Sequence, residues 1–360
     1  MKILILTNYD MGLYRFRREL IAELCKENEV IAALPDGEYI ENLKELGLKY
    51  INFEFKRRGM NPFADFSQLL RYIKLIKNVK PDVVLTYTIK PNVYGGMACQ
   101  RTKVPYIANV TGLGTSIENG GILSKLSKKL YKMGLSGAKC VFFQNKENKR
   151  LFEEYGIANG NNRLIPGSGV NLDMHPFEEY PEDRENIKFL FIGRVMRDKG
   201  IDELLTAIAG VHKRHENVSL DIVGGCEEDY SEKLSDAVKS GFVRYHGRQK
   251  LVHGFIKEAH CTVLPSYHEG LANVMLESAS TGRPVITTRI SGCRETFEEG
   301  ITGFGCEPKS AKSLEEAMEK FLALPYEEKA IMGKKGREKI ELEFDRNFVV
   351  KAYIEEIERV

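Results

Sequence analysis

The stretch LPSYHEGLANVMLES, residues 264–278, contains a complete turn from a strand into a helix. An apolar strand ends where the stretch begins, Gly270 lies in the turn, and a helix begins near Ala272. The unpaired N–H groups and the dipole of a helix N-terminus together favour an anion. Glu269 precedes this helix and Glu277 lies about two turns along it, so the carboxylates are on the order of 10 Å apart. An ordinary capped helix has the same pattern, so the stretch needs support from the rest of the chain.

A second turn of this kind lies earlier in the chain. The apolar run 188–192 ends at Gly193 and Arg194, and residues 198–200 open the next helix. In a doubly wound sheet, ligands bind at the carboxyl ends of the strands. Arg194 and Lys199 are therefore expected at the ligand crevice, where an arginine fork and a lysine point charge suit a diphosphate. The alternative is that both are solvated surface cations.

Strands and helices alternate along the whole chain. The predicted strands are 3–6, 29–34, 50–53, 83–87, 106–110, 140–143, 188–192, 219–223, 243–246, 261–264 and 285–288. The predicted helices are 15–26, 40–46, 66–77, 123–135, 201–215, 230–240 and 272–280. Short apolar strands between amphipathic helices predict parallel sheets covered by helices. The acidic segment 176–186 has two prolines and no apolar period, so we interpret it as a linker between two domains.

The composition excludes several classes of protein. Hydrophobic residues make up 42% of the chain and charged residues 29%, as in an ordinary globular protein. None of the seven cysteines has C-x-x-C spacing, which argues against zinc and thioredoxin-like sites and favours reduced thiols. The N-terminus lacks the core of a signal peptide, and no apolar run reaches the roughly 18 residues of a membrane span. These features predict a cytoplasmic protein.

Charge is distributed unevenly along the chain. Residues 1–175 carry 26 Lys or Arg and 17 Asp or Glu, whereas the remainder carries 27 and 34. The basic half includes the clusters 15–18 and 56–58 and is expected to face an anionic partner. The helix 122–133 has an apolar arc and a four-lysine arc, so it either packs on the core or lies on an anionic membrane. No nucleic-acid-binding motif accompanies the charge, so nucleic acid is not expected as a partner.

The first strand-to-helix turn, residues 7–13, contains a single glycine, Gly12. A dinucleotide-binding turn requires three glycines, so NAD binding is not expected there. One glycine still lets the N–H groups of a helix start approach one phosphate. The chain has no D-x-D sequence, so the usual carboxylate ligands of a diphosphate-bound metal are missing. We therefore expect no metal and no cofactor.

In combination, the C-terminal motifs resemble those of retaining family 4 glycosyltransferases with the GT-B fold. Glu269 and Glu277 have the E-x7-E spacing of that family. Gly193 and Arg194, with Lys199, look like its diphosphate-binding pair. The resemblance covers nearly the whole chain.

The resemblance implies an α/β architecture of two Rossmann-like domains whose parallel sheets face a cleft. Residues 1–172 would form the acceptor domain, to which a C-terminal helix at 345–360 would return. Residues 173–344 would form the domain that binds the nucleotide-sugar donor.

Within the family, residues 88–95, 111–114 and 141–145 are similar to a bacterial branch that extends polyprenyl-diphosphate-linked saccharides. The resemblance then implies transfer of a hexosyl group, such as a HexNAc or a uronic acid, from a UDP-sugar to a lipid-linked saccharide. The process would be glycan, capsule or exopolysaccharide assembly. The protein would work in the cytoplasm, in peripheral contact with the anionic inner face of the bacterial cell membrane.

The resemblance also assigns roles to residues. Glu269 would position the sugar and Glu277 the ribose, while Arg194 and Lys199 would stabilise the departing diphosphate. Further donor-site candidates are Gly193, Gly270, Leu271, Ala272, Asn273 and, for the base, Arg248. In the first domain the candidates are Gly12 and, for the acceptor diphosphate, Lys90.

Two departures from the family leave alternatives open. The family's donor loop has proline where Ala272 stands, which predicts a less restrained backbone. Many members place a first-domain histidine near the reacting carbon, whereas all seven histidines here lie at 175 or later, so Asn109 or Thr111 is the candidate for that role.

A non-hydrolysing UDP-sugar epimerase shares the fold but needs acid–base residues, which a histidine-free first half does not favour. A non-catalytic sugar-nucleotide-binding protein is the third possibility.

Overall fold

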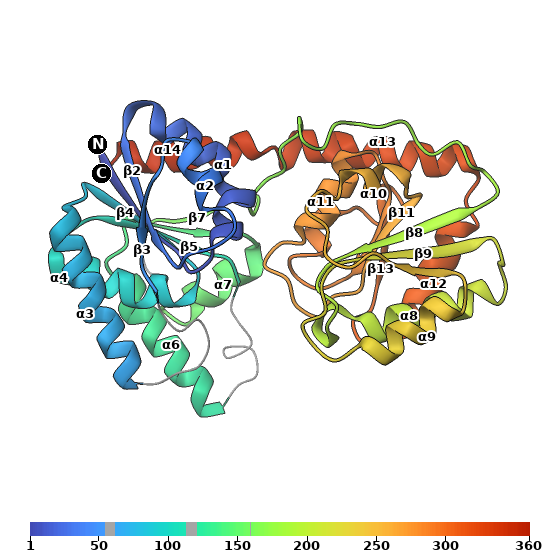
Figure 1. The fold of residues 1–360 in the computed structure, drawn as a ribbon, viewed down its shortest axis with the longest axis horizontal. Helices are drawn as coiled ribbons and strands as arrows, with labels where there is room; N and C mark the ends of the chain where they lie inside the picture. Colours follow the sequence, from blue (N-terminus) through green and yellow to red (C-terminus); the bar gives the residue numbers. More distant parts are fainter. Residues whose placement is uncertain (55–61, 113–120, 159) are drawn as a thin grey trace. The chain divides into compact units, whose positions relative to one another are not determined.

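The computed structural model describes residues 1–54, 62–112, 121–158 and 160–360. The chain forms two compact units (Figure 1). Unit 1 contains Met1–Ser168 and Arg346–Val360, and unit 2 contains Gly169–Asp345. The chain therefore crosses between the units twice.

Unit 1 is built on a seven-stranded sheet in the order β3-β2-β1-β4-β5-β6-β7. Its strands are β1 (Lys2–Leu6), β2 (Glu29–Leu34), β3 (Lys49–Asn52), β4 (Val83–Tyr87), β5 (Tyr106–Val110), β6 (Cys140–Phe143) and β7 (Asn162–Leu164). Neighbouring strands are parallel, and the strand order reverses between β1 and β4. Every residue of β4 and β5 is buried, as expected for strands covered on both faces.

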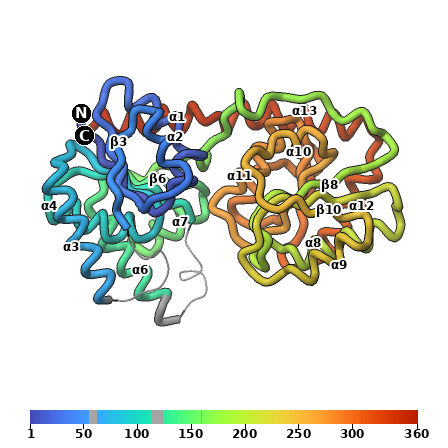
Figure 2. Tube along the Cα trace, in the orientation of Figure 1, coloured from blue at the N-terminus to red at the C-terminus, as the bar shows by residue number. Residues whose placement is uncertain are grey.

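Helices cover both faces of this sheet (Figure 1). They are α1 (Asp10–Glu27), α2 (Ile40–Glu45), α3 (Pro62–Val79), α4 (Gly96–Thr102), α6 (Gly121–Leu135), α7 (Lys146–Glu154) and α14 (Arg346–Glu358), with a π-helical segment η1 at Pro91–Gly95. Helix α14 packs on α1, and in Figure 2 the chain can be followed from its C-terminal end back to this contact. Tyr353 of α14 is buried against Phe142, with ring centroids 4.5 Å apart, and Arg163 binds Glu356 at 2.7 Å. The last helix is therefore part of the core of unit 1.

Unit 2 is built on a six-stranded parallel sheet in the order β10-β9-β8-β11-β12-β13, which reverses between β8 and β11. Its strands are β8 (Ile187–Ile192), β9 (Val218–Val223), β10 (Val243–Tyr245), β11 (Cys261–Leu264), β12 (Val285–Thr288) and β13 (Gly303–Cys306). Its helices are η2 (Arg197–Lys199), α8 (Ile201–His212), α9 (Ser231–Lys239), α10 (His253–Glu258), α11 (Asn273–Ser280), η3 (Arg294–Thr296), α12 (Ala311–Leu322) and α13 (Tyr326–Glu343). The predicted fold class, two Rossmann-like parallel-sheet domains, is confirmed.

The acidic segment 176–186 is not the free linker that its composition suggested. Arg283 is fully buried, and its guanidinium donates hydrogen bonds to the carbonyls of Glu178 and Glu179 at 2.9 and 2.8 Å. These bonds fasten the segment to unit 2. The chain leaves unit 1 earlier, between Ser168 and Gly169.

The apolar arc expected for residues 122–133 forms the buried face of α6 only in part, since Leu130 packs on the core and two other members do not. Leu126 and Met133 are each 43% exposed, whereas Ser127 and Tyr131 are buried. The helix packs on the core through Ser127, Leu130, Tyr131 and Leu135, and it leaves Leu126 and Met133 at the surface. The basic cluster 56–58 lies outside the described residues.

Candidate active site

The predicted donor-site residues lie at the carboxyl ends of neighbouring strands in unit 2. β8 ends at Ile192 and is followed by Gly193 and Arg194. β11 ends at Leu264, shortly before Glu269. These two strands are the neighbours at which the strand order reverses. Such a switch point is where doubly wound sheets bind their ligands.

Lys199 and Glu269, predicted from two separate turns, form one ion pair. Nζ of Lys199 contacts Oε1 of Glu269, and the two side chains are only 16% and 14% exposed. The hydroxyl of Ser266 donates to the same oxygen at 2.8 Å. Ser266 was not predicted, and its position three residues before Glu269 in a turn is the sequence signal that could have found it.

The two turns meet because a glycine lets them approach. Gly200 has φ +70°, a conformation that side chains disfavour, and a Cβ there would lie 2.1 Å from the carbonyl oxygen of Pro265. Next to it, the Tyr267 amide donates to the carbonyl of Asp198 at 2.9 Å. The position of Lys199 is therefore set by backbone contacts and not by its side chain alone.

The donor loop compensates for its missing proline. The N–H of Ala272, which a proline would lack, donates to the carbonyl of Gly292 at 2.7 Å. Gly292 has φ +86°, and a Cβ there would lie 2.4 Å from the Glu269 carbonyl oxygen. Leu271 and Ala272 are buried. A hydrogen bond at Ala272 thus anchors the loop at the position where the family has proline.

Helix α11 begins at Asn273 with no side-chain cap from Ala272. The positive end of its dipole therefore lies next to the turn that contains Gly270. Glu277 is partly buried in the second turn of this helix. The start of α11, the carboxylates of Glu269 and Glu277 and the ammonium group of Lys199 therefore belong to one region of unit 2.

The two arginines of the predicted donor site occupy neighbouring loops. Arg194 is half-exposed and binds Glu227 at 2.7 Å, so it does not join the partly buried pair of Lys199 and Glu269. Arg248 follows β10, where the carbonyl of Gly247 accepts a hydrogen bond from the Gly224 amide at 2.8 Å. Both arginines therefore lie at the carboxyl side of the sheet, on more exposed loops than Lys199.

In unit 1, a cavity of about 250 Å³ lies at the carboxyl ends of β1 and β4, where the strand order reverses. Gly12, in the first turn of α1, and Thr111, directly after β5, both line it. Lys90 lines a different hollow and binds Asp65 at 3.0 Å. The structure therefore brings Gly12 and Thr111 together and leaves Lys90 with its own counter-ion.

Asn109 belongs to the core and not to a ligand site. Its side chain is 1% exposed, its Nδ2 donates to the Tyr353 hydroxyl at 2.8 Å, and its Oδ1 accepts from Gln144 at 3.2 Å. Both amide atoms are used in linking α14 to the sheet. Of the two candidates for the contact to the reacting carbon, Thr111 is the one that lines the cavity.

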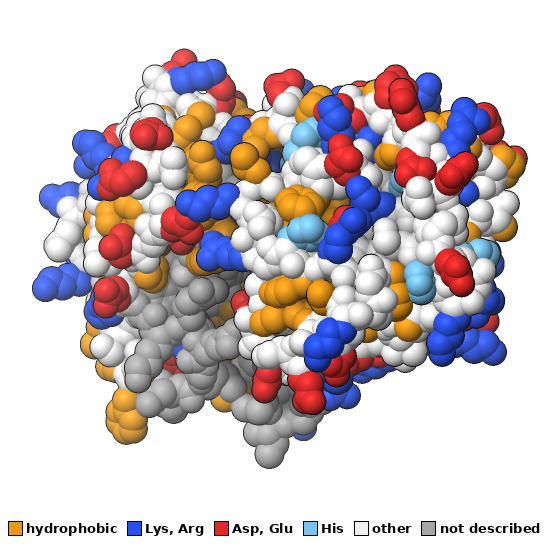
Figure 3. All heavy atoms as spheres, turned by 45° about the vertical axis from the view of Figure 1, so that its right-hand side comes forward, with side chains coloured by type: hydrophobic (Ala, Val, Ile, Leu, Met, Phe, Trp, Pro, Cys, Tyr) orange, Lys and Arg blue, Asp and Glu red, His pale blue; other side chains and the backbone are white. Residues whose placement is uncertain are grey.

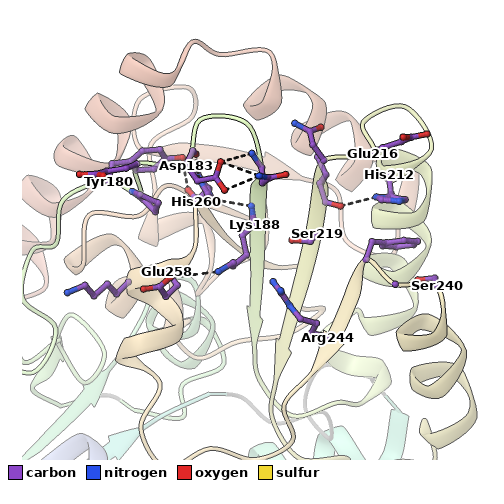
Figure 4. Close-up of a pocket in the computed structure, with 18 of the residues that line it drawn as sticks. Tyr180, Asp183, Lys188, His212, Glu216, Ser219, Ser240, Arg244, Glu258 and His260 are labelled. Atoms are coloured by element: carbon purple, nitrogen blue, oxygen red, sulfur yellow. Dashed lines mark hydrogen bonds and ion pairs between the residues drawn. The ribbon is translucent and has the colours of Figure 1, made fainter.

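Unit 2 has a larger hollow of about 790 Å³, and Figure 4 draws most of the residues that line it. Lys188, Ser219 and Arg244 of its lining lie at the starts of β8, β9 and β10. Arg244 binds Asp221 at 2.7 Å, and His260 accepts a hydrogen bond from the Lys188 amide at 3.1 Å. The hollow therefore lies at the amino ends of the strands, opposite the edge at which such sheets bind ligands.

Within the described ranges, no three His, Cys, Asp or Glu side chains are grouped as a metal site. No helix in the same ranges has the length and apolar character needed to cross a membrane.

The seven cysteines are unpaired. Cys293 lies close enough to Glu269 to sense its charge, and burial together with that charge raises the pKa of the thiol to about 12. This thiol is therefore protonated and unreactive at neutral pH.

Two family models match the chain: "Glycosyl transferases group 1" over residues 176–339 and "Glycosyl transferase 4-like" over residues 2–145. Both models describe glycosyltransferases, and together they span most of the chain. The chain therefore belongs to the GT-B glycosyltransferases and is a glycosyltransferase. The family predicted from the sequence motifs is confirmed.

Among curated proteins, the chain is 28% identical to N,N'-diacetylbacillosaminyl-diphospho-undecaprenol alpha-1,3-N-acetylgalactosaminyltransferase of Campylobacter jejuni, over 100% of this chain and 99% of the relative. It is 27% identical to the capsular polysaccharide biosynthesis glycosyltransferase CapM of Staphylococcus aureus, over 81% and 80% of the two chains. The crystal structure of Anabaena HepE with UDP and glucose has a TM-score of 0.83 over 100% of both chains, at 16% identity. That structural likeness concerns the fold alone.

Proposed function

We propose that the protein transfers a HexNAc or uronic acid residue from a UDP-sugar to a saccharide carried on a polyprenyl diphosphate, in glycan, capsule or exopolysaccharide assembly. The observation that carries the proposal is the partly buried Lys199–Glu269 pair at the switch point of unit 2. The acceptor is inferred from the Campylobacter jejuni relative, which acts on a diphospho-undecaprenol-linked sugar and matches the chain from end to end.

In the proposed reaction, the bond from the anomeric carbon to the phosphate oxygen breaks while a bond to the acceptor oxygen forms on the same face. The acceptor proton moves to the departing phosphate oxygen. Lys199, Arg194 and the start of α11 offset the charge that develops on the diphosphate. Glu269 orients the sugar, Glu277 binds the ribose and Arg248 contacts the base.

A panel of UDP- and GDP-sugars, read by thermal shift, tests the donor assignment. We expect UDP-sugars to raise the unfolding temperature and GDP-sugars to leave it unchanged. Stabilisation by GDP-sugars alone would contradict the assignment. An epimerase would convert the bound UDP-sugar into its epimer without an acceptor, and a sensor would leave it intact.

Transfer is proposed to need no metal ion. Two cationic side chains and a helix dipole supply the positive charge that a metal provides elsewhere. We expect the initial transfer rate to be the same with and without excess EDTA. Complete loss of transfer with EDTA, restored by Mg²⁺ or Mn²⁺, would show that the metal-free mechanism is wrong.

Glu277→Ala is expected to weaken UDP binding about 10- to 100-fold, since hydrogen bonds to a charged group contribute roughly 1.5–3 kcal/mol. Calorimetric titration with UDP measures the effect. Glu316→Ala, which removes an exposed carboxylate of α12, is the matched control. Equal UDP affinity in Glu277→Ala and the parent would remove the ribose assignment.

Peripheral binding of unit 1 to the anionic inner face of the cell membrane is also proposed. Helix α6 presents Lys125, Lys129 and Lys132 together with the exposed Leu126 and Met133. By contrast, on the face of unit 2 visible in Figure 3, Lys and Arg are interspersed with Asp and Glu. A lysine near an anionic leaflet contributes about 1 kcal/mol.

Replacing the three α6 lysines with serine is therefore expected to weaken binding to anionic vesicles roughly 100-fold at low salt. Lys128 is left in place because its ammonium lies over the Tyr155 ring, 3.5 Å from the centroid. Co-sedimentation with phosphatidylserine-containing and neutral vesicles measures the effect. The control replaces three exposed lysines of unit 2 by serine, at Lys312, Lys334 and Lys335. An equal loss in both variants would argue against α6.

A further inference from the structure

An arginine that has no counter-ion among the described residues is buried at the cavity of unit 1. Arg17 of α1 is only 4% exposed, although its sequence placed it in the basic cluster 15–18 expected at the surface. Nη1 donates to the carbonyl of Phe16 at 2.8 Å, and Nε has no hydrogen-bond partner in the part of the chain that the structure describes. Guanidinium is always charged, and a buried charge without an opposite charge is unfavourable. Among the described residues no carboxylate balances this charge, so Arg17 is poised for a bound anion.

Two more polar atoms at this cavity are unsatisfied. The hydroxyl of Tyr87, the last residue of β4, and Oγ1 of Thr88 are both buried without a hydrogen-bond partner among the described residues. Both residues line the cavity with Arg17. Cζ of Arg17 lies 5.4 Å from the centroid of the Tyr87 ring. One cation and two hydroxyl groups are thus gathered at the end of a single strand.

The backbone at this point is strained. Thr88 has φ +72°, which is rare for a β-branched residue. Its carbonyl accepts a hydrogen bond from the Asn92 amide at 3.0 Å, which holds the turn. Strained residues persist where the surroundings fix them, and they gather at ligand-binding sites. Here the strain fixes a hydroxyl-bearing residue at the cavity, where a ligand could use it.

The start of α1 adds a second source of positive field. Gly12 lies in the first turn of this 18-residue helix, whose N-cap, Tyr9, provides no side-chain cap. Gly12 and Tyr9 also line the cavity. Three other candidate cations are paired: Lys90 with Asp65, Arg194 with Glu227 and Lys199 with Glu269. Arg17 differs from them because no carboxylate in the described ranges lies within ion-pair distance of it.

We propose that Arg17, with the hydroxyls of Tyr87 and Thr88, binds a phosphate oxygen of the acceptor's diphosphate. This inference rests on the proposed function and assigns the acceptor diphosphate to Arg17, Tyr87 and Thr88 in place of Lys90, which has its own counter-ion in Asp65. Arginine donates in a planar fork that matches a phosphate, and hydroxyl groups complete the shell. The donor diphosphate has its own candidate residues in unit 2, so the two phosphate groups are bound by different units.

Calorimetric titration with two probes tests the assignment: farnesyl diphosphate represents the acceptor and UDP the donor. The parent is compared with Arg17→Gln, Tyr87→Phe and Arg18→Gln. Arg18→Gln is the matched control, because this neighbouring arginine is partly exposed and already paired with Glu19 at 3.0 Å. We expect farnesyl diphosphate binding to weaken at least tenfold in Arg17→Gln and several-fold in Tyr87→Phe. We expect no change in the control and unchanged UDP binding throughout.

Tyr87→Phe keeps the ring and removes only the hydroxyl, so it tests the site even if Arg17→Gln does not fold. Unchanged farnesyl diphosphate affinity in both variants, or no binding by the parent, would overturn the site. A loss confined to UDP would assign the anion to the donor and overturn the acceptor assignment. If the parent binds farnesyl diphosphate through Arg17 but transfers no sugar, the proposed function fails while the binding site stands.

Discussion

Replacing Lys199 with alanine is expected to lower kcat/KM for sugar transfer about 100- to 1,000-fold, since losing one preorganised donor at a developing charge costs roughly 2.7–4 kcal/mol. Lys199 is mostly buried, paired with Glu269 and held by the turn at Gly200. Its charge is therefore in place before the reaction begins. Arg194→Ala is expected to act in the same direction, although Arg194 is half-exposed and must first leave Glu227.

Steady-state release of UDP in the presence of acceptor measures this effect, and thermal unfolding checks that the variants are folded. Lys312→Ala removes an exposed lysine of unit 2 and is the control for charge alone. Near-parent activity in both Lys199→Ala and Arg194→Ala would remove their assignment to the diphosphate.

Glu269→Gln is expected to lower kcat about 100-fold while UDP binds as tightly as before or more tightly. Glu269 is proposed to contact the sugar, where charge develops, and only contacts that strengthen in the transition state raise the rate. UDP lacks that sugar, and the substitution releases Lys199 from its counter-ion. Glutamine keeps the shape of the side chain and can still accept the hydrogen bond from Ser266.

The measurement is kcat from initial rates together with the Kd of UDP from calorimetry. Glu307→Gln changes an exposed carboxylate that binds Arg289 at 3.2 Å and is the matched control. If Glu269→Gln weakens UDP binding as much as it lowers kcat, the carboxylate has a general structural role and not the proposed one at the sugar.

The strands could be predicted because a parallel sheet buried on both faces requires short, nearly continuous apolar runs. All eleven predicted strands lie within one residue of observed ones. Two strands were missed: β7, which has only three residues, and β13, whose sequence, GFGC, has two glycines, which disfavour strands. Gly303 is needed there because a Cβ would lie 2.1 Å from the Val285 carbonyl oxygen. The close approach of two strands depends on tertiary structure, so it cannot be predicted from the periodicity of apolar residues in the sequence.

The candidate site could be predicted only in part, for the same reason. Strand ends and helix starts gave Lys199 and Glu269 separately, but their ion pair depends on two turns that are distant in sequence and meet through Gly200. Asn109 was a candidate by position, yet its amide is used by Tyr353. Arg17 was counted as a surface charge, because burial of one arginine in a basic run cannot be read from the run itself.

The most direct test of the proposed transfer is the mass of the acceptor after incubation with a UDP-sugar. The full-length protein, a UDP-HexNAc or UDP-uronic acid and a polyprenyl-diphosphate-linked monosaccharide are combined in EDTA. We expect an acceptor that gains one sugar residue, with one UDP released for each gain. Release of UDP without acceptor gain, conversion of the UDP-sugar to its epimer, or binding without turnover of the UDP-sugar would contradict the proposed transfer.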